Sequence, residues 1–457
     1  MRNRGMLVLL AGLLLAGGLV LAVLRDRDDP PRYAGTLRVL LKSGYLPFEA
    51  PYTPGEKPYP IHERMAAFLD LYPEVRIEVR DAEGAIRDLR GAAGDAEWVP
   101  DIVELAPAEA RQMADSRRIV SLARRISRGA VWEDGYHRLI GYAAIDGKPY
   151  LLPVTADPLV VYYDSTTFRQ GGVPYPSEDW DWEEFTRKAN WLAGLGAPPG
   201  IPTDLESLEP FIRGLGGAYL SGSGGTASGR LDDDATVEAF SRFAGEMPIG
   251  EAIRDRPGKG RMPAIGLIRA SEMHRLIRER AGYYQPAPMP AAPSGERFNT
   301  SRMTGLAITA DSRNKALAWE LMTFIAGDSD DEALRFVAAN TLETASMWYR
   351  VRQDSRYETL KDVIAREIVH APPASFDWTF ADPDALPVLT LEELQAMADP
   401  REAKAILGRT ARKIDEILAS RGRLRIEEVR IGRSRDADRS GRRLEYNGLI
   451  LYEYRKV

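Results

Sequence analysis

Short apolar strands alternate with amphipathic helices near the start of the chain, and this alternation is the strongest constraint on its fold. Thr36 to Lys42 (TLRVLLK) and Val75 to Val79 (VRIEV) have strand patterns, and Ile61 to Tyr72 between them has apolar residues at helical spacing. A third short strand, Pro100 to Leu105 (PDIVEL), precedes another helical stretch. Consecutive β–α–β units imply parallel strands with helices on the faces of the sheet. The pattern therefore predicts an α/β fold in which ligands bind beyond the carboxyl ends of the strands.

An unbroken run of apolar residues and glycines, Met6 to Leu24, lies close to the N-terminus and follows Arg2 and Arg4. At about 1.5 Å per residue a helix of this run would span roughly 28 Å, close to the thickness of a bilayer core. We expect an uncleaved membrane anchor, because no A-x-A cleavage site stands at the end of the run, and a cleaved signal peptide is the alternative. The remaining chain has no comparable run. It is therefore expected to be a water-soluble body outside the cytoplasm.

Composition removes several classes of function. The chain has no Cys, which excludes disulfides, Cys-ligated zinc, iron–sulfur clusters, thiol catalysis and a lipidated cysteine. Its four His form no HExxH cluster, and it contains no GxGxxG, Walker A or GxSxG motif, so we expect neither a metal nor a cofactor. The formal net charge of -6, with Arg dispersed along the chain, argues against nucleic acid as a partner.

The last part of the chain differs from the rest, because Arg and Lys outnumber Asp and Glu between Arg421 and Val457. Within it, Leu424 to Ile431 and Leu444 to Tyr454 alternate enough to be strands. We interpret this extension as a β appendage on the body. A polybasic surface that contacts a membrane or a partner is the alternative.

A colinear series of segments resembles the extracellular solute-binding protein family of bacterial ABC importers, in the maltose-binding-protein-like class that binds sugars and oligosaccharides. The matching segments are FLDLYPEVRIEV, PDIVEL, DGKPYLLPVTADPLVVYYDSTTF, RLDDDATVEAFSRF, YYQPAPMP and TGLAITADSRNKALAWELMTFIAG. The resemblance implies a two-lobed, type II periplasmic-binding-protein-like α/β fold with a hinge and a central ligand cleft. It also implies a binding protein rather than an enzyme. A glycoside hydrolase with paired carboxylates gains no support from composition.

The same resemblance implies a domain organisation. The Pro-rich stretch Tyr284 to Ser294 is expected to cross between lobes, since Pro excludes helix and central strand. The expected parts are a signal or anchor with a linker (1–35), lobe 1 (36–155 and 288–330), lobe 2 (156–287 and 331–420) and the C-terminal extension (421–457).

Candidate ligand-binding residues combine aromatic rings, which cover the apolar faces of sugars, with carboxylates, which accept hydrogen bonds from hydroxyls. Two of them follow or end predicted strands at the ligand edge, one follows the turn at Pro153, and two aromatic residues precede the last helix. They are Tyr45, Glu104, Asp157, Trp348 and Trp378. Packing or a structural role is the alternative for each. Trp180-Asp181-Trp182 is instead expected to start a helix by packing and capping.

These features predict an extracytoplasmic solute-binding subunit of an ABC import system, which captures a carbohydrate and passes it unaltered to permease subunits. A membrane-anchored sensor or accessory protein with the same fold, not coupled to transport, is the alternative. The expected partners are a sugar or oligosaccharide, the permease, and the membrane through the N-terminal segment. Nothing in the sequence indicates oligomerisation, so we expect a monomer.

Overall fold

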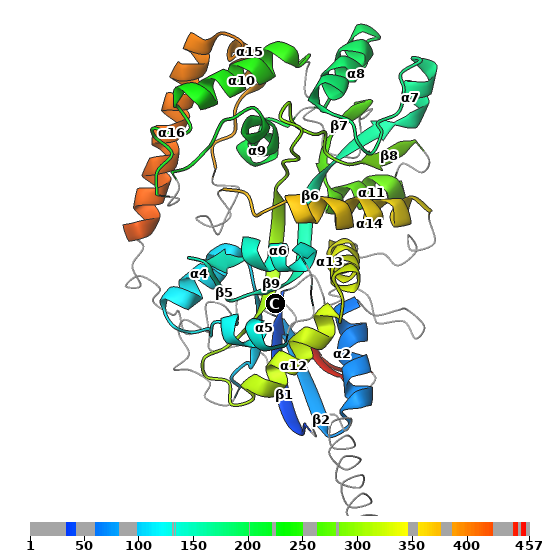
Figure 1. Ribbon diagram of the computed structural model, residues 1–457, viewed down its shortest axis with the longest axis vertical. Coiled ribbons are helices and arrows are strands. Elements are labelled where there is room, and N and C mark those ends of the chain that lie inside the picture. The colour runs from blue at the N-terminus through cyan, green and yellow to red at the C-terminus, as the bar shows by residue number, and fades with distance from the viewer. Residues whose placement is uncertain are drawn as a thin grey trace, which may run out of the picture.

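The computed structural model describes most of the body of the chain (Figure 1). The described residues are 33–42, 60–81, 98–129, 132, 134–200, 202–221, 225–249, 263–279, 283–345, 355–375, 386–423, 442–446 and 449–453. The predicted N-terminal anchor or signal, Met6 to Leu24, lies outside them. None of the helices in the described part of the chain combines the length and hydrophobicity that a membrane span needs.

The first strands form the parallel arrangement that their β–α–β pattern predicts. Strand β1 (Gly35–Leu41) lies between β2 (Val75–Asp81) and β3 (Ile102–Leu105), and both neighbours run parallel to it. Helix α2 (Pro60–Leu71) connects β1 to β2 and buries an apolar face. The observed pairing confirms the expected α/β class, since a parallel pair needs such a crossover connection.

Two antiparallel strands continue this sheet across the molecule. Strand β9 (Ser301–Ile308) pairs with β3 on one side and with β6 (Leu152–Asp164) on the other. The second half of β6 lies between β7 (Ile265–Arg269) and β8 (Tyr284–Ala287). Strand β8 is an edge, which is where the Pro in its sequence is tolerated. Figure 1 shows β6 and β9 running lengthwise between the two ends of the molecule.

The C-terminal extension adds a hairpin to the same sheet. Strands β10 (Arg442–Tyr446) and β11 (Leu449–Glu453) are antiparallel, and β11 runs parallel to β2 at the sheet edge. The predicted β appendage is therefore present, with the stretch expected to be one strand, Leu444 to Tyr454, folded as a hairpin. The other expected strand, Leu424 to Ile431, lies outside the described residues.

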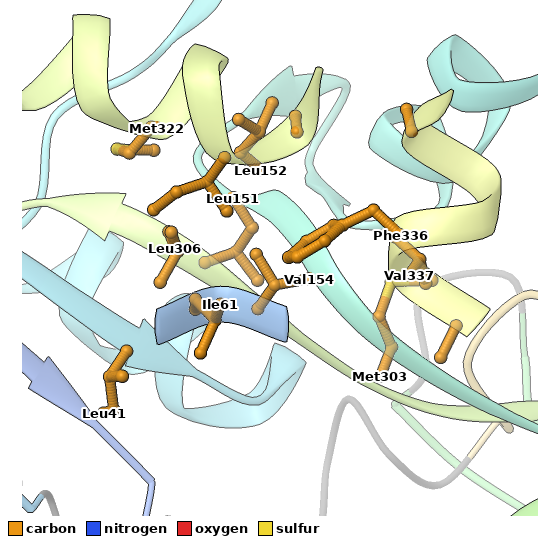
Figure 2. Packing of buried hydrophobic residues seen from close by; sticks show 14 of the residues in the cluster. Leu41, Ile61, Leu151, Leu152, Val154, Met303, Leu306, Met322, Phe336 and Val337 are labelled. Carbon is orange, nitrogen blue, oxygen red and sulfur yellow. The ribbon is translucent and has the colours of Figure 1, made fainter. Parts of the chain in front are cut away.

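Buried apolar side chains form two separate cores. The first surrounds the parallel strands and continues along one face of β6 (Figure 2). Each fully buried Leu, Ile or Phe contributes about 1.5–3 kcal/mol to folding. Its helices, besides α2, are α4 (Pro107–Asp115), α5 (Ala123–Gly129), α6 (Asp134–Tyr142), α11 (Ala270–Glu279), α12 (Lys315–Ala326), α13 (Asp330–Ala345) and α14 (Ser355–Glu367). A two-strand hairpin, β4 (Ala144–Ile145) with β5 (Lys148–Pro149), and the 3-10 turn η3 (Ile368–His370) complete this part.

The second core is rich in aromatic rings. Phe185 stacks on Phe211 at 5.7 Å between ring centroids, and Trp182 lies 5.2 Å from Phe211. The elements that surround it are α7 (Ser165–Gln170), α8 (Trp182–Gly194), α9 (Leu205–Gly214), α10 (Asp234–Glu246), α15 (Leu391–Ala396) and α16 (Pro400–Arg423). Trp180 is buried beside Phe185, and the Asp181 carboxylate accepts from the Glu184 amide at 2.8 Å. Packing and capping at this helix start are thereby confirmed.

The chain passes between the cores several times. Met289 is buried in the second core and Met303 in the first, so the return passage lies between these residues. Helices α13 and α14 contribute to the first core, which also includes residues of α11 and β8, so the assignment of residues 331–420 to the second lobe stays a prediction. Helix α13 packs against β6, with the Thr341 hydroxyl accepting from the Ala156 amide at 2.8 Å.

Candidate functional site

Strand β6 contributes to both cores, and we call its middle, where it pairs with β9, the junction. Before the junction Leu152 and Val154 belong to the first core. Beyond it one face of the strand, with Tyr162, stays in the first core and the other face, with Leu159 and Val161, belongs to the second. The side chains of β6 alternate between the faces of the sheet, so the residues between these two pairs present one packed face and one polar face. Figure 1 shows α6 on one side of this junction and α9 on the other.

A row of hydrogen-bonding side chains occupies the polar face of the junction. The Thr155 and Thr304 hydroxyls lie 2.6 Å apart across the two strands, and Thr304 donates to the carboxylate of Glu104. Arg302 stands opposite Asp157 in the β6–β9 register. We call this set of residues the junction strip: Glu104, Thr155, Asp157, Glu206, Arg302 and Thr304.

Glu104 ends the row on the side of the first core. Its carboxylate accepts from the Lys42 backbone amide at 3.0 Å and from the Thr304 hydroxyl, and only 1% of the residue is exposed. The Lys42 ammonium lies 2.9 Å from the carboxylate of Glu109, which also accepts from the Ala106 amide at the start of α4. Glu104 therefore ties the ends of β1, β3 and β9 together at the carboxyl edge of the parallel strands.

Asp157 lies at the centre of β6 and connects it to α11. Its carboxylate accepts from the Ser271 amide at 2.9 Å and from the Ser271 hydroxyl at 2.6 Å, in the first turn of that helix. Burial raises the pKa of Asp157, and the positive charge of Arg269 with the Ser271 hydrogen bonds opposes this increase. The carboxylate thus attaches the start of α11 to the middle of β6.

Glu206 of α9 connects this helix to β9 through Arg302 and to the end of β7 through Arg269. Its carboxylate accepts from Arg302 Nε at 3.1 Å and from Arg302 Nη2 at 3.0 Å, and it forms a buried ion pair with Arg269. Arg269 also donates to the carbonyls of Asp157 at 3.1 Å and Thr300 at 2.9 Å. Desolvation raises the pKa of Glu206, but the Arg269 and Arg302 charges outweigh it and the net pKa is lowered. The carboxylate is therefore ionised and held from two sides.

A second buried carboxylate on α9 anchors another segment near the junction. Glu209, one turn after Glu206, accepts from the Ser375 amide at 2.9 Å and from the Ser375 hydroxyl. Burial raises the pKa of Glu209, against the opposing Ser375 hydrogen bonds. Ser375, the last described residue before a gap, is thus attached to α9.

A third buried carboxylate, Glu367 at the end of α14, lies behind the crossing strands. It accepts from the Asn299 amide at 2.6 Å, and Asn299 in turn donates to the Leu159 carbonyl at 2.9 Å. Arg297 lies 3.7 Å from the Glu367 carboxylate. Burial raises the pKa of Glu367 to about 7, despite the opposing Asn299 hydrogen bond and Arg297 charge.

The structure thus brings two of the sequence-predicted site residues, Glu104 and Asp157, onto one strip. The three aromatic candidates lie outside the described residues: Tyr45, Trp348 and Trp378. The sequence analysis missed Glu206, Arg269 and Arg302. The sequence signal for these residues is a charged residue next to apolar ones. Arg269 ends the otherwise apolar strand IGLIR. Glu206 lies three residues before Glu209 on α9, and the helix buries both side chains.

Arg302 is the exposed charged member of the strip, with 54% of its side chain accessible, whereas the carboxylates of Glu104 and Glu206 are almost wholly buried and hold its hydrogen-bonding groups in place. Among the described residues, no three His, Asp or Glu side chains gather as a metal site would require.

No protein-family profile matches the chain. A Brucella abortus protein named as a binding protein is 25% identical to this chain over 206 residues, which cover 40% of this chain. The match spans about half of that relative, 48% of its length.

Solved structures match over most of the chain. The binding protein for cyclic α-maltosyl-1,6-maltose from Arthrobacter globiformis has a TM-score of 0.60 and 16% identity, covering 85% of this chain and 100% of that one. A family 1 extracellular solute-binding protein from Alicyclobacillus acidocaldarius has a TM-score of 0.59 and 14% identity, covering 86% and 100%. UgpB from Mycobacterium tuberculosis, in complex with glycerophosphocholine, has a TM-score of 0.56 and 17% identity, covering 86% and 100%. The chain therefore has the two-lobed type II periplasmic-binding-protein fold of ABC solute-binding proteins.

Proposed function

We propose that the protein is the solute-binding subunit of an ABC import system and captures a carbohydrate, in particular an oligosaccharide, between its two lobes. The observation that supports this most is the junction strip, a row of hydrogen-bonding side chains where the strands cross between two separate cores. Hydroxyl-rich solutes need such paired donors and acceptors. The similarity in fold to a maltosyl-maltose-binding protein agrees with it.

The proposed mechanism is closure of one lobe on the other about β6 and β9. One lobe contains the parallel strands β1, β2 and β3 and the other contains the second core, with the junction strip between them. A solute that contacts both lobes favours the closed form, because only that form provides both sets of contacts. The solute is then released unaltered to the permease.

Five residues are proposed to contribute to the binding site. Glu104 and Asp157 lie on the junction strip and would position its hydrogen-bonding groups. The aromatic rings would stack on sugar faces, as the family resemblance implies. These are Tyr45, Trp348 and Trp378.

The proposed location is outside the cytoplasm, with Met6 to Leu24 as a membrane anchor or signal peptide. This location places the binding site where an importer meets its solute. The permease would be the partner at the membrane, and the protein would act as a monomer. In this proposal the basic extension, which joins the sheet at β2, is a structural part of the first lobe.

The experiment combines a thermal-shift screen of the full chain with calorimetry and small-angle scattering. A bound solute raises the melting temperature, by mass action on the native state, and lowers the radius of gyration on closure. The panel contains neutral oligosaccharides, monosaccharides and glycerophosphocholine. Binding of none of the sugars would contradict the carbohydrate assignment. An unchanged radius of gyration with saturating solute would contradict hinge closure.

Transport is tested separately in the organism. Deletion of the gene should abolish uptake of the solute that calorimetry identifies. Unchanged uptake together with a lost transcriptional response to that solute would instead favour the alternative, a sensor that is not coupled to transport.

A further inference from the structure

Arg302 differs from its neighbours on β9 in exposure. Ser301 and Met303 on either side of it are buried, at 0% and 2% exposed, while 54% of the Arg302 side chain is exposed. This alternation places Arg302 on the polar face of the crossing strands, with Thr304 two residues further along the same face. A charged side chain at a junction between two cores therefore remains accessible to a solute.

The position of its guanidinium is fixed. Glu206 accepts two hydrogen bonds from Arg302, at 3.1 Å and 3.0 Å, in the parallel geometry of a bidentate pair. Glu206 itself cannot turn away easily, because only 7% of its side chain is exposed and Arg269 holds its Oε1 atom. Preorganisation of this kind reduces the entropy lost when a donor binds a ligand.

The charges around the strip nearly cancel. Arg302, Arg269 and Lys42 contribute positive groups, and the nearby carboxylates are Glu104, Glu109, Asp157 and Glu206. Each of the three cations has an acidic neighbour within ion-pair distance. Two hydrogen bonds to the buried Glu206 carboxylate compensate the charge of Arg302, and its remaining N–H groups can donate to the hydroxyls of a neutral solute.

We propose that Arg302 is a specificity-determining residue that donates hydrogen bonds to a neutral, hydroxyl-rich solute, with Glu206 as the positioning residue that holds its guanidinium. The inference rests on the proposed function and adds the solute's charge class and the residue that selects it. Lys cannot replace Arg302 in this role. A guanidinium can donate two parallel hydrogen bonds to a carboxylate and still donate to a solute from its other N–H groups, whereas an ammonium has no such planar arrangement of donors.

The test uses the full chain and its Arg302→Ala and Arg302→Lys variants. Arg335→Ala on α13 is the matched control, because Arg335 is 70% exposed and pairs with Asp331 at 3.1 Å away from the strip. Calorimetry measures affinity for maltotetraose, cellotetraose and raffinose as neutral probes, and for tetragalacturonate as the anionic probe. Melting temperatures are measured in parallel. Glu206 keeps Arg269 when Arg302 is removed, so both variants should fold.

We expect wild type and Arg335→Ala to bind a neutral probe equally, and both Arg302 variants to bind it about 10- to 100-fold more weakly, as for loss of a hydrogen bond to a charged group. Equal affinity in the Arg302 variants and wild type would overturn the inference and leave the proposed function standing. Tighter wild-type binding of tetragalacturonate than of any neutral probe would overturn the charge class. Wild type that binds no probe would contradict the carbohydrate assignment and the inference together.

Discussion

Replacement of Glu367 by Gln is expected to remove a pH dependence from the stability of this protein. The wild-type carboxyl is buried beside Asn299, and burial raises its pKa to about 7, against 4.5 for an ordinary glutamate. Between these two pH values the native state binds the proton and the unfolded state does not. The free energy of unfolding therefore decreases as the pH rises from about 4.5 to 7, and the stability is lowest once the buried carboxyl is ionised.

The size of this effect follows from the two pKa values. A difference of one pKa unit corresponds to about 1.36 kcal/mol, so the full effect is about 3 kcal/mol. The positive groups that face Glu367 are Arg297 and Arg366, and their attraction for the ionised carboxyl is already contained in its raised pKa. Glu367→Gln should then be more stable than wild type at pH 8, with a gain about 2–3 kcal/mol larger there than at pH 5.

Urea unfolding at pH 5 and pH 8, followed by tryptophan fluorescence, measures this difference. Other buried carboxyls titrate in both proteins and cancel in the comparison. The matched control is Glu358→Gln on the same helix, whose carboxylate is 59% exposed and pairs with Lys361 at 2.8 Å. That variant should change the free energy of unfolding by less than about 1 kcal/mol at either pH. A Glu367→Gln difference that is the same at pH 5 and pH 8 would refute the assignment of a raised pKa to Glu367.

Three further substitutions test packing, buried polarity and capping. Gly266→Ala should destabilise the protein by about 1–3 kcal/mol, since the new Cβ would lie 2.5 Å from the buried Tyr162 hydroxyl. Gly245→Ala on α10, where the space is open, should stabilise it by about 0.5–1 kcal/mol, and urea midpoints that move in the same direction would contradict this. Thr300→Val should be neutral or stabilising by about 1 kcal/mol, because the buried Thr300 hydroxyl has no hydrogen-bond partner among the described residues; a loss above about 1 kcal/mol, measured by urea unfolding, would show that the hydroxyl is satisfied. Asp164→Ala should cost about 0.5–2 kcal/mol in the same assay, because its carboxylate caps α7, and an unchanged midpoint would show that the cap is dispensable.

Local sequence patterns were sufficient for the elements and their class. The strand–helix–strand alternation that begins at β1 predicted parallel neighbours, and β1, β2 and β3 pair in that way. Asp181 stands before an apolar helical pattern, and it caps α8. The Asn447-Gly448 pair between β10 and β11 is a strong hairpin signal that the sequence analysis did not use. Periodicity and capping act over a few residues, so they can be read from the chain alone.

The candidate site depends on contacts that no local pattern contains. Glu206 meets Arg269 and Arg302, which lie 63 and 96 residues further along the chain. These three side chains come together because β9 inserts between β3 and β6, and because α9 lies close enough to β7 and β9 for Glu206 to pair with both arginines. The sequence by itself determined the parallel sheet, the helix starts and the exclusion of cysteine chemistry. Only the tertiary structure decided which charged side chains share the junction, because burial and pairing free energies depend on neighbours that folding brings together from distant parts of the chain.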